Sequence, residues 1–427
     1  MNTLFKTLLC TVALTAITNI NAFAQTIVIK ANKTVTNQSA GILDNATILI
    51  ENGRIKAIGV NADYKGDTVI LGEGTWVTPG LFAPYSNLGL VEVSAASSSN
   101  DSAASEADAN ITLRAIDSFN PHASPVAVSR LGGITHAVIV PGASNSIFGG
   151  LGTVISTNGS LDVMDAAPRF LHVELGASGA DTAGGSRSAS LGILRAALSD
   201  AANIGTRYSK NTHDGAVISK YEATVLTDVL SGKIALMVQA DRAIDIVNII
   251  KLKRNRMKII IVGAAEAWMV ADKLANANIS VLIDPIEVLP YNFESLGTRG
   301  DNAKLLKQAG VRFAIMTRTA TGAGAHNLRL LTQHAAKSVA NGLDWDSAFK
   351  AITLTPSTMM GMPSLGKLEA GKMANLVVWS GDPLEVTSTP IAVIIDGKLQ
   401  SMTSRQTELA DKYNPTRTNA KPYGYRP

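Results

Sequence analysis

Short runs of alternating apolar and polar residues follow residue 25. They read Thr26-Ile-Val-Ile-Lys-Ala, Ala46-Thr-Ile-Leu-Ile and Arg54-Ile-Lys-Ala-Ile-Gly. A period of two is typical of strands that bury one face. Asn52-Gly53 separates the last two runs, and this dipeptide favours a two-residue hairpin turn. Residues 25–78 are therefore predicted to form a small antiparallel β unit.

Longer apolar runs without alternation fill the middle of the chain. After residue 233 they recur at intervals of roughly 20 to 30 residues, the length of one βα unit, with helical patterns at 242–254 and 265–276 between them. Strands buried on both faces have this continuous apolar character. The runs begin at Ile134, Ile234, Met257, Ile279 and Val311. They predict an α/β fold, with residues 79–363 forming a (β/α)8 TIM-like barrel.

Two segments show no periodicity: residues 93–110, which are rich in Ser, Ala and Asp, and residues 176–192, which are rich in Gly, Ser and Ala. They are predicted to be long loops on the face where barrel enzymes build their sites. Residues 405–427 are assigned to a C-terminal tail, which is predicted to be extended from residue 411 onward.

The first residues have the pattern of a cleaved secretory signal. Lys6 precedes an apolar run, and Ala22-Phe23-Ala24 has the Ala-x-Ala pattern of a cleavage site, so residues 1–24 are predicted to be removed. A retained anchor is the alternative, but a bilayer needs about 20 apolar residues and this run is shorter. The prediction is an exported, periplasmic protein with no membrane span after cleavage. Cys10 is the only cysteine, so the processed chain lacks disulfides, thiolate zinc sites and cysteine nucleophiles.

Composition narrows the class of protein further. Hydrophobic residues make up 46% of the chain and charged residues 17%, which is typical of a globular protein with a large core. The formal net charge is +4, and its basic residues are scattered rather than clustered with aromatic residues. This pattern argues against nucleic acid as a partner.

Thr78-Pro79-Gly80-Leu-Phe-Ala-Pro-Tyr85-Ser-Asn87 resembles the first barrel strand of the amidohydrolase superfamily. The segment from Gly366 to Pro383, with Leu-Glu-Ala-Gly-Lys-Met-Ala-Asn-Leu-Val-Val inside it, and a later Val-Ile-Ile-Asp-Gly-Lys resemble its closing strands. The resemblance implies that residues 364–404 join 25–78 in one composite β-sandwich. Phrases such as Ala240-Asp-Arg and Ala264-Ala-Glu-Ala-Trp are similar to an exported bacterial branch related to imidazolonepropionase-like and dipeptidase-like amidohydrolases.

The resemblance also implies where a metal centre would lie. Metal-dependent members carry two His on the first strand, a carbamylated Lys or a Glu on the fourth, a His on the fifth and sixth, and an Asp on the eighth. The corresponding residues here are Tyr85, Asn87, Gln239, Gly263 and Arg318, while the sequence leaves the fourth strand unplaced. A guanidinium would repel a divalent cation. The usual metal centre is therefore predicted to be absent and no cofactor is predicted, with zinc compatible only with non-standard ligands.

Candidate site residues follow from their positions after these strands. Glu266 or Asp241 is predicted to act as general base, with Arg318 or Tyr85 stabilising an oxyanion. The predicted binding residues are Tyr85, Asn87, Gln239, His122 and His326. An alternative for Asp241 is an ion pair with Arg242 that caps a helix. His136 and His172 lie within strand-like runs and are predicted to be structural.

Three functions remain open from the sequence. One is a hydrolase acting on carbon-nitrogen bonds, other than peptide bonds, of a small polar amide or cyclic amide. The second is a metal-free pseudoenzyme that binds a small ligand or a partner in the periplasm. The third is a metal enzyme rebuilt from His122, His326, Asp241 and Glu266. The sequence leaves the oligomeric state open, a homo-oligomer included.

Overall fold

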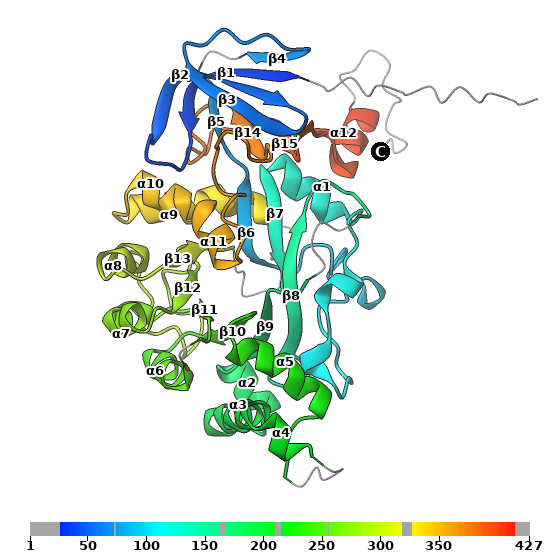
Figure 1. Ribbon diagram of the computed structural model, residues 1–427, viewed down its shortest axis with the longest axis vertical. Helices are drawn as coiled ribbons and strands as arrows, with labels where there is room; N and C mark the ends of the chain where they lie inside the picture. Colours follow the sequence, from blue (N-terminus) through cyan, green and yellow to red (C-terminus); the bar gives the residue numbers. More distant parts are fainter. Residues whose placement is uncertain are drawn as a thin grey trace, which may run out of the picture.

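The computed structural model describes residues 26–71, 74–162, 167–209, 215–254, 256–317 and 327–414. Figure 1 shows a β-sheet unit at the top and a larger unit of strands and helices below it. The predicted signal peptide, Arg318, His326 and the end of the chain from residue 415 lie outside the described residues.

The small unit is built from strands at both ends of the chain. The sheet order is β16-β15-β14-β5-β1-β2-β3, with β4 also paired to β1. The N-terminal strands are β1 (Ile27–Val35), β2 (Ile42–Glu51), β3 (Arg54–Val60), β4 (Thr68–Leu71) and β5 (Trp76–Pro79). The C-terminal strands are β14 (Leu376–Trp379), β15 (Pro390–Ile395) and β16 (Lys398–Leu399). The composite sheet expected from the resemblance is thus present.

The predicted hairpin at Asn52-Gly53 is confirmed. Glu51 pairs with Arg54 across the turn, and the φ angles of Asn52 and Gly53 are +52° and +78°. A type I′ turn needs positive φ at both central residues, which Asn and Gly tolerate best. The turn residues therefore set the register of β2 against β3.

Strands β14 and β15 bury both of their faces. Leu376, Val378 and Ile394 belong to the core of the small unit, together with Ile29 and Ile48. Their neighbours in sequence belong instead to the layer between the barrel strands and the helices: Val377, Trp379, Val393 and Ile395. This double burial explains the unbroken apolar runs and attaches the small unit to the barrel.

The large unit is an eight-stranded, nearly closed barrel. Its order follows the chain: β6 (Leu81–Ser86), β7 (Ile134–Ile139), β8 (Phe148–Ser156), β9 (Phe170–Glu174), β10 (Ala235–Ala240), β11 (Ile259–Gly263), β12 (Ser280–Ile283) and β13 (Phe313–Ile315). Strand β8 runs antiparallel to both neighbours, whereas the other pairings are parallel. The barrel therefore departs from a strict (β/α)8 repeat at its third strand.

The gap between the first and last strands is bridged rather than paired. The backbone N–H of Phe82 on β6 donates to Ile352 O, and that of Ile315 on β13 donates to Ala351 O. The adjacent residues Ala351 and Ile352 precede helix α11 (Leu354–Met359) and stand in for a direct β6–β13 ladder.

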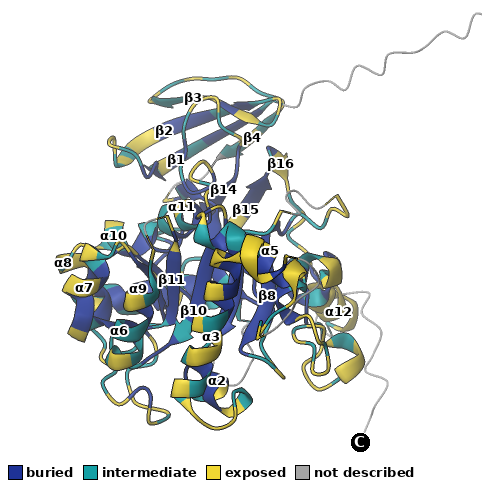
Figure 2. Ribbon diagram, turned by 60° about the horizontal axis from the view of Figure 1, so that its bottom comes forward, coloured by how far each residue is buried: buried dark blue, intermediate teal, exposed yellow. Residues whose placement is uncertain are grey.

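Helices cover the outside of the barrel, and Figure 2 shows their outer faces exposed around buried strands. They are α1 (Ser124–Leu131), α2 (Ala177–Thr182), α3 (Arg187–Ala202), α4 (Ile204–Arg207), α5 (Lys220–Leu230), α6 (Ala243–Leu252), α7 (Ala271–Asn276), α8 (Asn302–Gln308), α9 (Leu331–Ala340), α10 (Trp345–Lys350) and α12 (Arg405–Tyr413), besides α11. Among the described residues no helix is long and apolar enough to cross a membrane.

Two sequence predictions of irregular structure were wrong. Residues 176–192 form α2 and the start of α3, because alanine favours helix and the Ser186 side chain caps α3 by accepting from Ser188 N. Gly184 and Gly185, both at positive φ, separate the two helices. The predicted extended tail begins inside α12, which runs to Tyr413 and starts at a capping box on Ser404.

Candidate functional site

Alternation along the strands fixes which side chains enter the barrel. On β9, Phe170 belongs to the interior cluster, whereas Leu171 and Val173 belong to the outer layer. Because successive side chains on a strand point to opposite faces, His172 and Glu174 share the interior face with Phe170. Glu174 is the last residue of β9 and is partly exposed. It therefore places a carboxylate at the carboxyl end of the fourth strand.

Gln239 lies beside Glu174 on the next strand. The parallel register of β9 and β10 pairs Glu174 with Gln239, and the backbone N–H of Leu175 donates to Gln239 O at 3.3 Å. Met237 belongs to the interior cluster, so Gln239, two residues further, enters the barrel on the same face. We call this end of the barrel, formed by the carboxyl ends of β6, β9 and β10, the barrel mouth.

Tyr85 and Asn87 reach the mouth from β6. A register shift between Ala83 and Ser86 turns Tyr85 inward, where it packs against the interior cluster. Its ring meets the His172 ring edge-on, with centroids 6.1 Å apart. The Asn87 Oδ1 atom is buried and accepts no hydrogen bond. A buried acceptor without a donor costs free energy, so this atom is ready to accept from a ligand.

The sixth strand contributes no polar side chain to the mouth. The φ angles of Gly263 and Ala264 are +93° and +53°, which breaks the alternation and sends the Ala264 methyl into the outer layer. Asn302 Nδ2 donates to Ala264 O at 3.1 Å and holds this turn. For a residue other than glycine a left-handed φ costs about 1 kcal/mol or more. The backbone here is thus shaped by packing rather than by a ligand-binding side chain.

Glu266 and Asp241, predicted as general bases, contact backbone N–H groups. Glu266 Oε2 accepts from Ala243 N at 2.8 Å and Oε1 accepts from Gly297 N at 3.2 Å. The buried Asp241 side chain accepts from Ala265 N at 3.4 Å. Glu266 therefore caps the first turn of α6 and holds the loop before α8, and its catalytic role stays a prediction.

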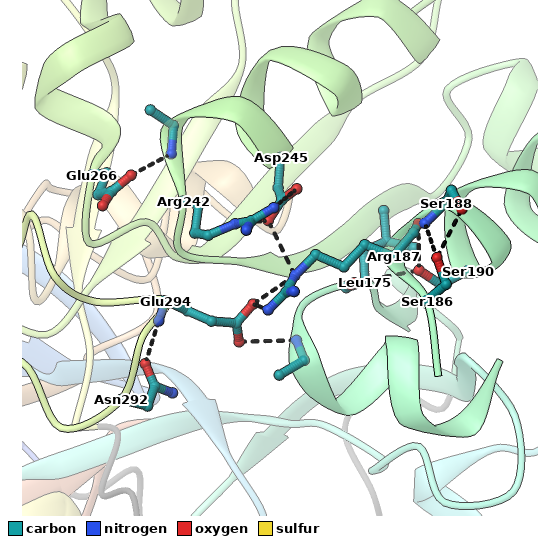
Figure 3. A network of polar contacts seen from close by, with 12 residues as sticks. Leu175, Ser186, Arg187, Ser188, Ser190, Arg242, Asp245, Glu266, Asn292 and Glu294 are labelled. Carbon is teal, nitrogen blue, oxygen red and sulfur yellow. Dashed lines mark hydrogen bonds and ion pairs between the residues drawn. The ribbon is translucent and has the colours of Figure 1, made fainter. Parts of the chain in front are cut away.

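An ion network of Arg187, Glu294, Arg242 and Asp245 lies beside Glu266, as Figure 3 shows. Arg187 Nη2 donates to Glu294 Oε1 at 2.7 Å, and Glu294 Oε2 accepts from Ala177 N at the start of α2. Arg242 makes a two-pronged contact with Asp245, and this hydrogen bonding raises the pKa of Arg242. Arg242 therefore pairs with Asp245, and not with Asp241 as the sequence alternative had it.

Three of the described histidines, His122, His136 and His334, lie in three separate places. His122 is exposed, and its Nε2 is 3.0 Å from Gly159 O. Gly159 follows the end of β8, and this end of β8 lies beside the start of β7. The structure therefore does not bring His122 to Tyr85 and Asn87. His136 is fully buried against Phe82, and desolvation lowers its pKa to about 4. His334 Nδ1, on α9, lies 2.9 Å from Asp284 Oδ1, and both side chains are buried.

Sequence reasoning missed Glu174. The five-residue run Phe170-Leu-His-Val-Glu is too short for periodicity to separate a strand from other buried segments. The one sign of it in the sequence was a glutamate at the end of an apolar run as long as a strand. Of the predicted binding residues, the structure brings Tyr85, Asn87 and Gln239 to the mouth, and adds His172 and Glu174 to them. Arg318 and His326 lie outside the described residues.

The mouth does not fit the metal centre of this fold. Among the described residues its donors, besides His172, are one phenol, two carboxamides and the carboxylate of Glu174, where divalent zinc prefers imidazole, thiolate and several carboxylates. His172 Nδ1 is already 2.8 Å from Pro141 O. Within the described ranges no three His, Cys, Asp or Glu side chains come together as a metal-binding group.

Comparisons with known proteins agree with this fold. The model of the amidohydrolase family matches residues 205–400. An amidohydrolase from Thermotoga maritima MSB8 superposes with a TM-score of 0.77 at 24% identity, covering 87% of this chain and 99% of that one. A triazine hydrolase from Arthobacter aurescens superposes with a TM-score of 0.52 at 15% identity, covering 91% and 98%.

One curated relative matches a short stretch. Over 75 residues the chain is 40% identical to amidohydrolase tasK of Hapsidospora irregularis. These residues make up 17% of this chain and only 8% of that protein. The family model covers residues 205–400, and the architecture from the composite sheet to the barrel is shared with the solved amidohydrolase. The chain therefore has the amidohydrolase fold and is similar to the amidohydrolase family over the matched residues.

Proposed function

We propose that the barrel mouth binds a small polar amide or cyclic amide and hydrolyses its carbon-nitrogen bond. The observation that carries this proposal is the pairing of Glu174 with Gln239 at the carboxyl ends of adjacent strands. A carboxylate can take a proton from water, and a neighbouring carboxamide can donate to the oxygen that becomes negative. The signal pattern predicted at residues 1–24 extends the proposal to an exported, periplasmic protein.

In the proposed reaction, Glu174 removes a proton from a water molecule as the water oxygen bonds to the amide carbon. The electron pair of the carbonyl moves onto its oxygen, which accepts a hydrogen bond from the Gln239 side chain. The carbon-nitrogen bond then breaks as Glu174 returns the proton to the leaving nitrogen. Asn87 Oδ1, which is buried and accepts no hydrogen bond, receives an N–H of the substrate. Arg318 stays a proposed second donor to the oxyanion.

The second candidate is binding without turnover. It is favoured by the residues at the family's metal positions, where Tyr85, Asn87 and Gln239 replace histidines. Such groups recognise polar ligands but polarise a carbonyl far less than a divalent ion does. The same barrel mouth would then serve a metal-free pseudoenzyme.

Metal analysis and a substrate screen separate these candidates. We expect the purified protein to carry no stoichiometric metal after dialysis, and to hydrolyse at least one member of a panel of amides, lactams and dipeptides. Glu174→Gln keeps the side-chain shape and should lower kcat at least 100-fold, while the exposed Glu408→Gln on α12 should leave it unchanged. A panel member that binds without turnover would favour the pseudoenzyme, and retained zinc would overturn the metal-free mechanism.

A further inference from the structure

The loop between β12 and α8 presents large apolar side chains to solvent. Exposed fractions are 86% for Phe293, 78% for Leu289 and 62% for Leu296, which are unusual values for residues of this kind. Met269, on the preceding βα connection, lies beside this loop, because a Cβ on Gly297 would come within 2.6 Å of its methyl group. The apolar loop surface consists of Met269, Ile286, Leu289, Tyr291, Phe293 and Leu296.

This surface is held in place from below. Thr298 Oγ1 donates to Glu287 O at 2.7 Å and closes the neck of the loop. Glu294 reaches back to Arg187 and to the start of α2, as Figure 3 shows, and Trp268 Nε1 donates to Gly297 O at 2.8 Å. The apolar side chains are thus presented by an anchored loop rather than by a loose one.

The size of the surface matches one half of a protein interface. Large side chains offer roughly 150–250 Å² each, so the six exposed fractions add up to on the order of 700 Å². The largest apolar patch on a typical monomer is about 300–600 Å². Each partner in a standard interface buries about 800 Å².

The charges of the loop favour a second copy of this chain over a membrane. Between Ile286 and Thr298 the sequence contains no Lys or Arg, and its two acidic residues, Glu287 and Glu294, are not among the exposed ones. Segments that lie on anionic lipid carry basic residues beside their apolar side chains. A homodimer interface is instead apolar and depleted in charge, and it pairs one patch with itself about a two-fold axis.

We propose that the apolar loop surface is the dimer interface of this protein. The segment from Leu289 to Phe293 of one copy packs against the same segment of the other copy. Since the loop follows the carboxyl end of the seventh barrel strand, the second copy lies beside the barrel end that holds Glu174. The interface is independent of whether the mouth is catalytic.

Sedimentation velocity over a range of protein concentrations tests the proposal. We expect the wild-type protein to sediment as a dimer, and Leu289→Asp combined with Phe293→Asp to raise the dimer dissociation constant at least ~100-fold with an unchanged circular dichroism spectrum. Tyr221→Asp on α5, whose side chain is 72% exposed away from this loop, is the matched control and should remain dimeric. A monomeric wild-type protein, or a dimeric double variant, would overturn the proposal.

Cysteine cross-linking is a second test of the interface, and it places no charge on the apolar loop surface. In a Cys10→Ser background, Phe293→Cys or Leu296→Cys should form an intermolecular disulfide on oxidation, whereas Tyr221→Cys should not. Equal cross-linking from Tyr221→Cys would overturn the assignment of the interface. Sedimentation with phosphatidylglycerol vesicles by a protein that is monomeric in solution would also overturn it, and would assign the loop to a lipid surface.

Discussion

Glu266 Oε2 accepts a hydrogen bond from the backbone N–H of Ala243 at 2.8 Å, so a carboxylate after the sixth strand caps the helix after the fifth. Removing such a cap typically costs about 0.5–2 kcal/mol. We expect Glu266→Ala to lower the free energy of unfolding by that amount in urea titrations. Glu266→Gln keeps a side-chain oxygen and should cost less.

The same pair of variants tests Glu266 as a base. If it is only a cap, Glu266→Gln should retain turnover of any substrate found within about threefold. A loss of 100-fold or more, with stability largely kept, would instead make Glu266 the general base, because proton transfer contributes about that much.

Burial lowers the pKa of His136 to about 4, from 6.5 for an exposed histidine. The folded state therefore binds fewer protons than the unfolded chain between these two values, and stability rises with pH there. The contribution of neutral His136 to the free energy of unfolding is fully present above pH 6.5. It decreases as the pH falls and is lost by pH 4, which lowers the free energy of unfolding by about 3 kcal/mol in total.

Urea unfolding at pH 7.5, 6 and 5 measures this dependence. His136→Leu should flatten the part of the curve between pH 6.5 and 4, whereas the exposed His122→Leu should not change it. Equal pH dependence in wild type and His136→Leu would show that other groups cause it.

Gly397 touches the turn of the N-terminal hairpin. Its φ is +75°, and a Cβ there would lie 1.9 Å from Gly53 Cα, a backbone atom that cannot swing away. We expect Gly397→Ala to destabilise the protein by about 3 kcal/mol or more through backbone strain and overpacking. Gly41→Ala, with φ +65° and open space around it, is the control and should cost about 1 kcal/mol. Thermal unfolding of the two variants provides the comparison.

Arg187 joins two buried carboxylates. It lies 2.7 Å from Glu294 and 3.7 Å from Asp245, whose side chains are only 10% and 12% exposed. Without Arg187, Asp245 keeps Arg242, but Glu294 keeps only the backbone N–H of Ala177 and loses its cation, so Arg187→Ala should cost about 2–4 kcal/mol. Arg195→Ala, an exposed arginine on the same helix, should change stability by less than about 0.5 kcal/mol. Adding Glu294→Gln to Arg187→Ala should restore part of the loss.

Features set by a few neighbouring residues were predictable from the sequence. Asn52-Gly53 fixes a hairpin turn through its own φ angles, and the apolar runs at Met257 and Ile279 became β11 and β12. The third strand was not predictable as antiparallel, because direction depends on neighbours and not on the pattern of β8 itself. Residues 176–192 misled because glycine content suggested a loop, while Glu294, far away in sequence, supplies the acceptor at the start of α2.

The site was predictable only in part. Tyr85, Asn87 and Gln239 come to the mouth because their strands were placed correctly. Glu174 was missed with its short strand. The contacts of Glu266 depend on Ala243 and Gly297, 23 and 31 residues away, which no local pattern shows.

The composite sheet also sets an order of folding. Trp379 Nε1 donates to Thr78 Oγ1 at 2.9 Å across 301 residues of chain, and β14 pairs with β5 beside this contact. Until Leu376 and the rest of β14 are available to pair, β5 has an open edge, and an open strand edge invites pairing with another chain. The β7–β8–β9 meander needs only local contacts and can form first. A chain that stops before Leu376 should therefore aggregate through β5, even though every barrel strand has been made.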